Sequence, residues 1–295
     1  MPDALIAELD AFEGHAYAVS FSPDGKRLLV GGFGGLIRVY DTTSWQEVAQ
    51  FVHHDKSTNH IEFAPDNDTF AVSSSDRTIS VWKSDDTEPS AILKGHRNTV
   101  MGLSWSPDGS CLASAATDTT IRIWDPANPD TKPTSLKAPY RIGAQVEYMP
   151  DGETLITAGG GDEALVWSLE SGEVIAQMPG HDKSARAMQL TADASRVMTQ
   201  DFGGAIHMWS TSDWSLIESH DIGSKAPRSV TLSPDGTRLA VMEEKRVRVL
   251  ALPSLESVAE YPLSIKGVHL ASFNPGGNLL AVTAADGKAR VWNLA

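Results

Sequence analysis

The chain has 295 residues, of which 41% are hydrophobic, and a formal net charge of −14 from 24 basic and 38 acidic residues. A chain of this length buries a large core, and its acidic balance disfavours binding to nucleic acid or to an anionic membrane. Its single cysteine, Cys111, excludes an intrachain disulfide and a zinc site built from cysteines.

The first residues, MPDALIAELDAF, lack the basic segment and apolar run of a secretion signal. No stretch of the sequence approaches the roughly 20 apolar residues that a membrane span needs. We therefore expect a cytoplasmic protein that contacts neither membrane nor nucleic acid.

A short turn motif recurs along the whole chain. SPDG begins at Ser22, Ser106 and Ser233, and related tetrapeptides begin at Ala64, Met149, Thr191 and Asn274. Their second residues stand at 23, 65, 107, 150, 192, 234 and 275, so the period is 41 to 43 residues. A large residue ends an alternating segment in each unit, at Tyr40, Trp82, Trp124, Trp167, Trp209, Leu250 and Trp292. A fixed period of this size predicts a repeat architecture of seven units.

Each unit is typical of short strands joined by tight turns. In the segment 99–125, TVMGLSWSPDGSCLASAATDTTIRIWD, apolar and polar residues alternate on either side of Pro-Asp-Gly. Proline presets a turn dihedral, aspartate bonds the following backbone and glycine accepts a left-handed conformation. No segment has a sustained helical period, so the sequence predicts an all-β fold, a seven-bladed β-propeller of four-stranded antiparallel blades.

The units resemble WD repeats, and the resemblance covers essentially the whole chain. The third unit is the most similar, with Gly95-His96, SPDG, Leu112 to Ser114, Asp118 and the tripeptide IWD. Gly-His recurs at Gly14 and Gly180, whereas the fourth, sixth and seventh units lack it. The regular SPDG turns resemble those of prokaryotic members of this family. The resemblance implies one propeller domain over residues 1–295.

The two chain ends are in phase with one blade. The chain stops at the third strand of the seventh unit, and ALIAEL precedes the first Gly-His as an outermost strand would. We expect a strand over about residues 4–12 to complete the last blade, about residues 265–295. With Met1 at its start, we take the sequence to be an entire protein.

The resemblance also implies a buried hydrogen-bonded tetrad that fastens an outer loop to its blade. In the third unit it consists of His96, Ser114, Asp118 and Trp124. The second unit has a partial version in which Val72 replaces the serine, consisting of His54, Asp76 and Trp82. These residue types also form hydrolase triads, which are recognised by geometry. Because buried polar groups must satisfy one another, we favour the structural interpretation and expect no catalytic residue and no enzyme activity.

Two further motifs bear on cofactors. VHHDKSTNH contains the ligand types of divalent metals, at His53, His54, Asp55 and His60. The tetrad engages His54, and alternation along a strand does not bring His53 and His60 together, so we expect no metal. The glycine run GGFGG enters a strand instead of a helix, and DFGG repeats it in the fifth unit, so it predicts a turn and no cofactor site.

Propellers of this family commonly bind partners with the end at which the inner strands begin. The positions six residues before the turn proline are Tyr17, Asn59, Met101, Ala144, Arg186, Arg228 and His269. Those before the turn aspartate include Phe33, Phe202 and Glu243. We expect Arg186, Phe202, Arg228 and Glu243 to lie together and to bind a peptide with acidic and apolar side chains. The alternative is that the aromatic rings pack over the glycine turns and the arginines pair with Glu243 or other carboxylates.

The favoured function is a non-catalytic protein-interaction scaffold that is monomeric on its own. Exposed aromatic residues and arginine are enriched at the energetic centres of interfaces. The alternative is a small-molecule-binding or hydrolytic propeller that uses the mouth of the channel, because one fold hosts many functions. Trp45 and Trp214 follow the third strands of their units and, if both are exposed, mark a competing interface at the opposite end.

Overall fold

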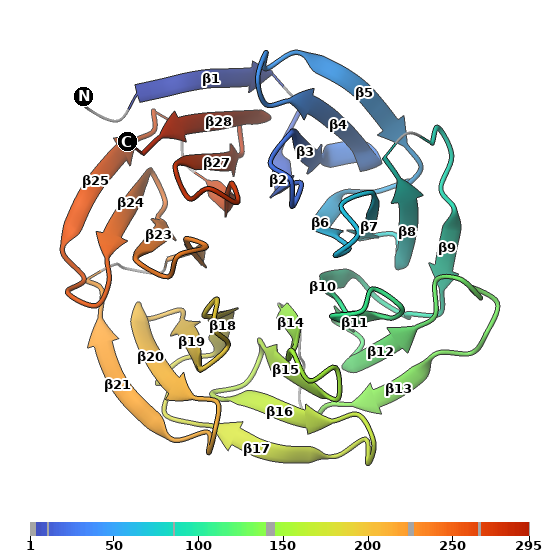
Figure 1. Cartoon of the computed structure of the whole chain (residues 1–295), viewed down its shortest axis with the longest axis vertical. Coiled ribbons are helices and arrows are strands. Elements are labelled where there is room, and N and C mark those ends of the chain that lie inside the picture. The colour runs from blue at the N-terminus through green and yellow to red at the C-terminus, as the bar shows by residue number, and fades with distance from the viewer. Residues whose placement is uncertain are drawn as a thin grey trace. The chain divides into compact units, whose positions relative to one another are not determined.

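The computed structural model describes residues 4–10, 12–84, 86–139, 145–223, 227–264 and 267–294. These residues form seven four-stranded antiparallel sheets (Figure 1), which confirms the seven-bladed β-propeller. Two compact units are distinguished, residues 1–61 with 222–295 and residues 62–221, and each is described by itself. Blades are numbered in chain order.

The first unit contains blades 1, 6 and 7. Blade 1 is β2 (Ala16–Phe21), β3 (Arg27–Gly32), β4 (Leu36–Asp41) and β5 (Glu47–Val52). Blade 6 is β22 (Ser229–Leu232), β23 (Arg238–Met242), β24 (Arg246–Ala251) and β25 (Ser257–Pro262). Blade 7 is β26 (Val268–Phe273), β27 (Leu279–Ala284), β28 (Lys288–Asn293) and β1 (Ala4–Asp10).

The second unit contains blades 3, 4 and 5 and most of blade 2, whose strand β6 (Thr58–Phe63) begins in the first unit. Blade 2 continues with β7 (Thr69–Ser74), β8 (Thr78–Lys83) and β9 (Ala91–Lys94). Blade 3 is β10 (Val100–Trp105), β11 (Leu112–Ala116), β12 (Thr120–Trp124) and β13 (Thr134–Lys137). Blade 4 is β14 (Gln145–Tyr148), β15 (Thr154–Ala158), β16 (Ala164–Ser168) and β17 (Val174–Met178). Blade 5 is β18 (Ala185–Leu190), β19 (Arg196–Asp201), β20 (Ala205–Ser210) and β21 (Leu216–Asp221).

Burial follows the position of a strand in its blade. Every residue of β11 is buried, because the second strand is covered on both faces and flanked by two neighbours. The outer strand β5 alternates and leaves Val48 and Val52 exposed. Blades 2 and 3 share one apolar cluster around Trp105 and Trp124. The inner strands are thus held by packing, while several exposed apolar side chains lie on outer strands.

The recurring turns are fastened by their aspartates. In blade 3, Asp108 accepts hydrogen bonds from the Ser106 hydroxyl at 2.7 Å and from the Ser110 amide at 3.0 Å. These donors lower the pKa of Asp108 to about 2. Gly109 follows with φ of +72°, a conformation that glycine adopts without strain. Much of the acidic charge therefore serves the turns.

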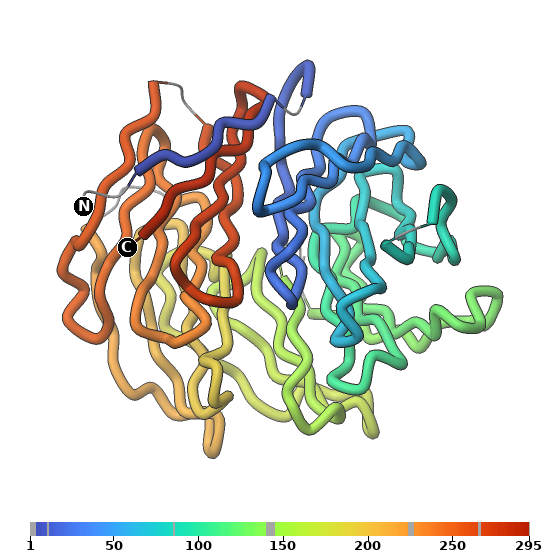
Figure 2. Tube along the Cα trace, turned by 45° about the horizontal axis from the view of Figure 1, so that its top comes forward, coloured from blue at the N-terminus to red at the C-terminus, as the bar shows by residue number. Residues whose placement is uncertain are grey.

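Strand β1 completes blade 7, as expected. It pairs antiparallel with β28, with Glu8 opposite Arg290, and Figure 2 shows the blue first strand running beside the red last one. The Glu8 carboxylate lies 3.0 Å from Arg290 Nε and 2.5 Å from Lys288 Nζ. Backbone pairing and these ion pairs together join the two ends of the described chain.

The glycine run GGFGG forms the turn between β3 and β4, as its phase predicted. A single turn of 3-10 helix covers Phe33–Gly35, with φ of +76° at both Gly34 and Gly35. A Cβ atom on Gly35 would lie 2.0 Å from the His54 carbonyl oxygen. The turn is therefore packed tightly on one side and presents Phe33, 61% exposed, on the other.

Candidate functional site

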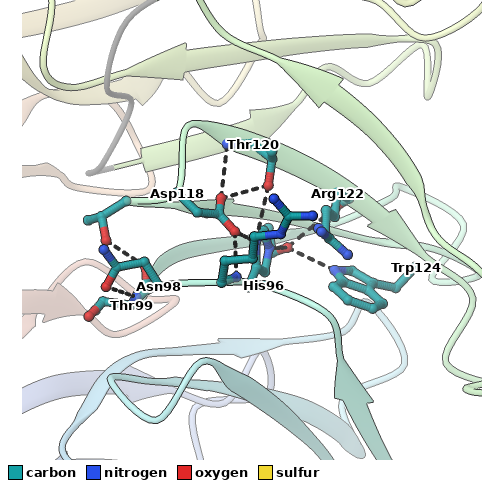
Figure 3. Close-up of polar contacts among 10 residues, drawn as sticks. His96, Asn98, Thr99, Asp118, Thr120, Arg122 and Trp124 are labelled. Atoms are coloured by element: carbon teal, nitrogen blue, oxygen red, sulfur yellow. Dashed lines mark hydrogen bonds and ion pairs between the residues drawn. The ribbon is translucent and has the colours of Figure 1, made fainter.

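Blade 3 contains a complete polar network (Figure 3). His96 follows β9, and its Nδ1 and Nε2 atoms lie 3.0 Å from Asp118 Oδ2 and 2.8 Å from Ser114 Oγ. Trp124 Nε1 donates to the same Ser114 oxygen at 2.8 Å. The imidazole thereby joins the loop after β9 to strands β11 and β12.

The charges of this network fix its proton positions. Burial raises the pKa of Asp118, but the Thr120 hydroxyl, the Arg97 amide and His96 overcome this and lower that pKa to about 2. Burial lowers the pKa of His96 despite the attraction of Asp118. A neutral imidazole beside an ionised carboxylate must carry its proton on Nδ1, so the Ser114 hydroxyl donates to His96 Nε2. Ser114 has no solvent exposure, and its oxygen is bonded to His96 and Trp124.

The glycine before His96 makes room for an arginine. A Cβ atom on Gly95 would lie 2.4 Å from Arg122 Nη1. The Arg122 guanidinium lies 5.8 Å from the centre of the Trp124 ring. Gly95 thus permits a cation to cover the tryptophan of the tetrad.

In blade 2 the tetrad serine is absent from β7, and a serine on the neighbouring strand β8 accepts the tryptophan N–H instead. Val72 on β7 stands opposite Ser80 on β8, and Trp82 Nε1 donates to Ser80 Oγ at 2.7 Å. Asp76 accepts the Thr78 amide at 2.9 Å. His54 is buried in the first unit, and its pairing with Asp76 and Trp82 stays a prediction.

Blade 5 contains a network that the sequence reasoning missed. His181 Nε2 and Trp209 Nε1 both lie 2.8 Å from Thr199 Oγ1. Asp201 Oδ2 is 3.8 Å from His181 Nδ1, and Oδ1 of the same carboxylate accepts the Gly203 amide at 2.7 Å. Asp201 ends β19. In blade 3 the aspartate stands six residues before the tryptophan, but in blade 5 that position is Gly203, two residues after Asp201. The Gly-His at residues 180–181 was the available signal.

Blades 6 and 7 use arginine where the histidine is absent. Arg248, two residues before Leu250, donates from Nε to Glu243 at 2.7 Å and from Nη2 to the Ile222 carbonyl at 2.7 Å. Arg290, two residues before Trp292, lies 2.6 Å from Asp286. A guanidinium that bonds both a carboxylate and a loop carbonyl fastens the loop as His96 does in blade 3.

Glu243, expected on the binding face, is an internal partner of its own blade. Its side chain is nearly buried, and its two oxygens bond Arg246 and Arg248. The carboxylate is therefore neutralised by two cations from β24.

In the first unit the candidate face residues include a cluster of rings. The Tyr17 ring centroid lies 4.8 Å from that of His269, and His15 Nδ1 lies 3.1 Å from His269 Nε2. Tyr17 and His269 are half-buried, whereas Phe33 is exposed. Arg228 is half-buried, and its amide donates to the Met242 carbonyl.

In the second unit, Arg186 and Phe202 lie together. The Arg186 guanidinium is 4.4 Å from the centre of the Phe202 ring, which is 41% exposed. Met101 and, in the first unit, Asn59 are half-buried. Ala144 lies outside the described residues. The expected grouping of Arg186 and Phe202 with Arg228 and Glu243 stays a prediction, because the latter two belong to the other unit.

The tryptophans at the opposite end of the blades pack inward. Trp45 and Trp214 are half-buried, and each contacts the apolar core near its own blade. Both have positive φ, 56° and 59° respectively. They cap their hairpins and do not form two exposed aromatic patches.

In the described ranges, no three histidine, cysteine, aspartate or glutamate side chains gather as ligands for a metal ion. Burial lowers the pKa of His60, from the HHDKSTNH segment, to about 4. No helix of the described chain has the length and apolar character to cross a membrane.

Comparison with protein families also finds a β-propeller. The family model described as IFT122 first beta-propeller matches residues 15–293. The chain belongs to this family. The match covers all seven repeats and agrees with the WD-repeat β-propeller predicted from the sequence.

Individual proteins are similar to shorter stretches of this chain. Eukaryotic translation initiation factor 3 subunit I of Pyricularia oryzae is 25% identical over 39% of this chain and 34% of its own. Protein groucho of Drosophila melanogaster is 28% identical over 34% of this chain and 14% of its own. Apoptotic protease-activating factor 1 of Rattus norvegicus is 21% identical over 50% of this chain and 12% of its own. The matched stretch spans about a third of the length of the first relatives.

Proposed function

We propose that the chain is a non-catalytic scaffold that binds a protein or peptide through the loops at which the inner strands of its blades begin. Membership of a WD-repeat propeller family supports a protein-interaction function in general. In the blade with the complete tetrad, the hydrogen bonds of that network are used within the blade. We further propose that the protein is monomeric on its own and acts in the cytoplasm.

The observation that carries the proposal is the exposure of two phenylalanines at equivalent turns. Phe33 follows β3 and is 61% exposed, and Phe202 follows β19 and is 41% exposed. Covering such rings removes apolar area from water, which favours association. Arg186, which lies over Phe202, adds a cation at the same place. An apolar side chain beside a carboxylate on the partner is complementary to this pair.

The proposal is tested with arrays of synthetic peptides that carry leucine or phenylalanine beside aspartate, glutamate, serine or lysine. We expect the acidic and apolar peptides to bind the wild type, and to lose binding to F33S and to the double variant R186E/F202S. The control variants are V52S and I175S, which remove exposed apolar side chains from the outer strands β5 and β17.

If F33S and R186E/F202S bound the peptides as well as the control variants do, the proposed binding face would be wrong, although a scaffold function through another surface would still be possible. If only the outer-strand variants V52S and I175S lost peptide binding, the interface would lie on the outer strands of the blades. Light scattering of the purified protein tests the monomeric state, and a dimer mass contradicts it.

A further inference from the structure

Blade 6 contains a cavity at the hairpin that joins β24 to β25. Its volume is about 350 Å³. Apolar side chains line part of it, from Val249, Ala251, Leu252, Val258, Ala259 and Leu294, while Thr237 and Arg238 also line it and polar atoms make up somewhat more than half of the open wall. Ligand pockets measure roughly 300–1,000 Å³, so the cavity suits a small ligand.

The cavity is at a position where the repeat departs from its own pattern. The residue directly after the large strand-ending residue is polar in the other six units, at Asp41, Lys83, Asp125, Ser168, Ser210 and Asn293. In blade 1, Asp41 Oδ1 accepts the amide of Ser44 at 2.8 Å and so caps its hairpin. Blade 6 has Ala251 there, which offers no hydrogen-bonding side chain. The small apolar residue leaves both space and an apolar surface.

The cavity also exposes an apolar side chain. Val258 on the outer strand β25 is 55% exposed, and it lines the same space as Leu252 and Ala259. An aliphatic ligand that covered Val258 would remove this surface from water. The apolar part of the wall is thus complementary to an aliphatic chain, and the polar part to a charged head group.

Arg238 supplies charge at the wall of the cavity. Its Nη1 atom donates to the Leu294 carbonyl oxygen at 2.8 Å. Among the described residues, this is the one hydrogen bond that its guanidinium makes, although the group has five N–H donors. The nearby Asp235 carboxylate accepts from the Ser233 hydroxyl at 2.5 Å and the Thr237 hydroxyl at 2.8 Å. The charge of Arg238 is one of the causes that lower the pKa of Asp235, but no hydrogen bond joins the two side chains among the described residues.

We propose that this cavity binds an aliphatic carboxylate, with the chain against Val249, Leu252 and Val258 and the carboxylate on Arg238. Arginine recognises carboxylates through paired N–H donors, and such charge-assisted hydrogen bonds are the stronger kind. This site lies at the SPDG-turn end of blade 6, apart from the loops of the proposed partner face.

The probe is octanoate, measured by titration calorimetry against octan-1-ol and octylamine. We expect octanoate to bind about tenfold more tightly than the alcohol, and octylamine to bind more weakly than both. Absence of octanoate binding, or equal binding of the three probes, would overturn the proposal.

Three variants locate the ligand. In R238Q we expect octanoate binding to fall about tenfold while octan-1-ol binding is unchanged. The matched control is R196Q, which changes the exposed arginine at the same position of blade 5 and should leave both affinities unchanged. A251D places in blade 6 the residue that blades 1 and 3 have, so the fold accommodates it, and we expect it to abolish octanoate binding.

Thermal unfolding of each variant shows that it is folded before binding is compared. Unchanged octanoate affinity in folded R238Q and A251D would show that the carboxylate binds elsewhere and would overturn the proposal. An equal loss in R196Q and R238Q would do so as well, because it would indicate general electrostatic attraction.

Discussion

The ring of His207 packs edge-on against the ring of His181 inside blade 5, with 4.3 Å between their centroids. Both side chains are buried, and both nitrogens of His207 lack a hydrogen-bond partner among the described residues. Burial lowers the pKa of His181 to about 4, with a further contribution from His207, although Asp201 opposes both. Burial also lowers the pKa of His207. Blade 5 therefore folds around two neutral imidazoles.

This pair predicts a loss of stability in mild acid. A histidine whose pKa is lower in the folded than in the unfolded state takes up its proton on unfolding, so stability falls as pH falls below about 6.5. For His181 the loss continues to about pH 4 and amounts to about 3 kcal/mol. Glu147 acts in the opposite direction, because burial raises its pKa to about 7. The measurement must therefore compare variants across this range and not rely on one curve.

The comparison uses H207L in urea unfolding at pH 7.5 and pH 5. Leucine removes nitrogens that have no partner, so we expect little change at pH 7.5 and a smaller drop towards pH 5 than in the wild type. The control is H220Q, which changes a histidine on the outer strand β21 and should keep the wild-type drop. An identical drop in all three proteins would show that the buried pair does not control acid stability.

The blade 3 tetrad predicts a specific requirement for a hydroxyl at Ser114. S114A leaves the Trp124 N–H and His96 Nε2 without their shared partner, and we expect a loss of about 3 kcal/mol in unfolding free energy. S114T should retain most of the stability, because Thr157 and Thr199 accept the tryptophan N–H in blades 4 and 5. S110A, on the exposed turn, is the control. A threonine variant as unstable as the alanine variant would mean that volume, and not the hydrogen bonds, matters here.

Local spacing in the sequence was sufficient to predict the blades. The turn residues and the large strand-ending residues are adjacent in the chain to the strands that they bound, so their phase marks each hairpin. In blade 2, Ser80 accepts the tryptophan N–H in place of the serine that is absent at position 72, and this depends on the register between β7 and β8. Spacing along the chain does not bring positions 72 and 80 together, because they are neighbours only across the hairpin.

The candidate site was harder to predict, because it depends on side-chain packing. Glu243 stands at a face position by its spacing, yet Arg246 and Arg248 on the next strand engage its carboxylate. Asp201 reaches the position of Asp118 from a different place in the turn. Spacing along the chain could not predict that arginines take the place of the histidine in blades 6 and 7, or that the aspartate of blade 5 stands two residues earlier. Both arrangements depend on contacts between side chains of different strands.

The ion pairs between β1 and β28 predict unequal effects of their two cations. The Arg290 side chain is 10% exposed and bonds both Glu8 and Asp286, whereas the Lys288 side chain is 32% exposed. R290M leaves two carboxylates without their shared cation, and we expect a loss of about 2 kcal/mol in unfolding free energy, whereas K288M should cost clearly less. Hydrogen exchange of the β1 amides should rise more in R290M. Equal exchange in both variants would show that backbone pairing alone holds β1.

The two central glycines of the first turn provide a matched pair. Gly34 and Gly35 both have φ of +76°, but a Cβ atom on Gly34 has nothing within 4 Å, whereas one on Gly35 meets the His54 carbonyl at 2.0 Å. G34A therefore lowers the unfolding free energy only by the cost of placing alanine in a left-handed conformation, about 1 kcal/mol, and should preserve the exposure of Phe33. G35A must in addition displace the backbone at His54, and we expect a loss of several kcal/mol in urea unfolding. Equal losses would mean that the turn tolerates the extra atom by moving as a whole, and the close approach to His54 would then not determine the conformation of the loop that carries Phe33.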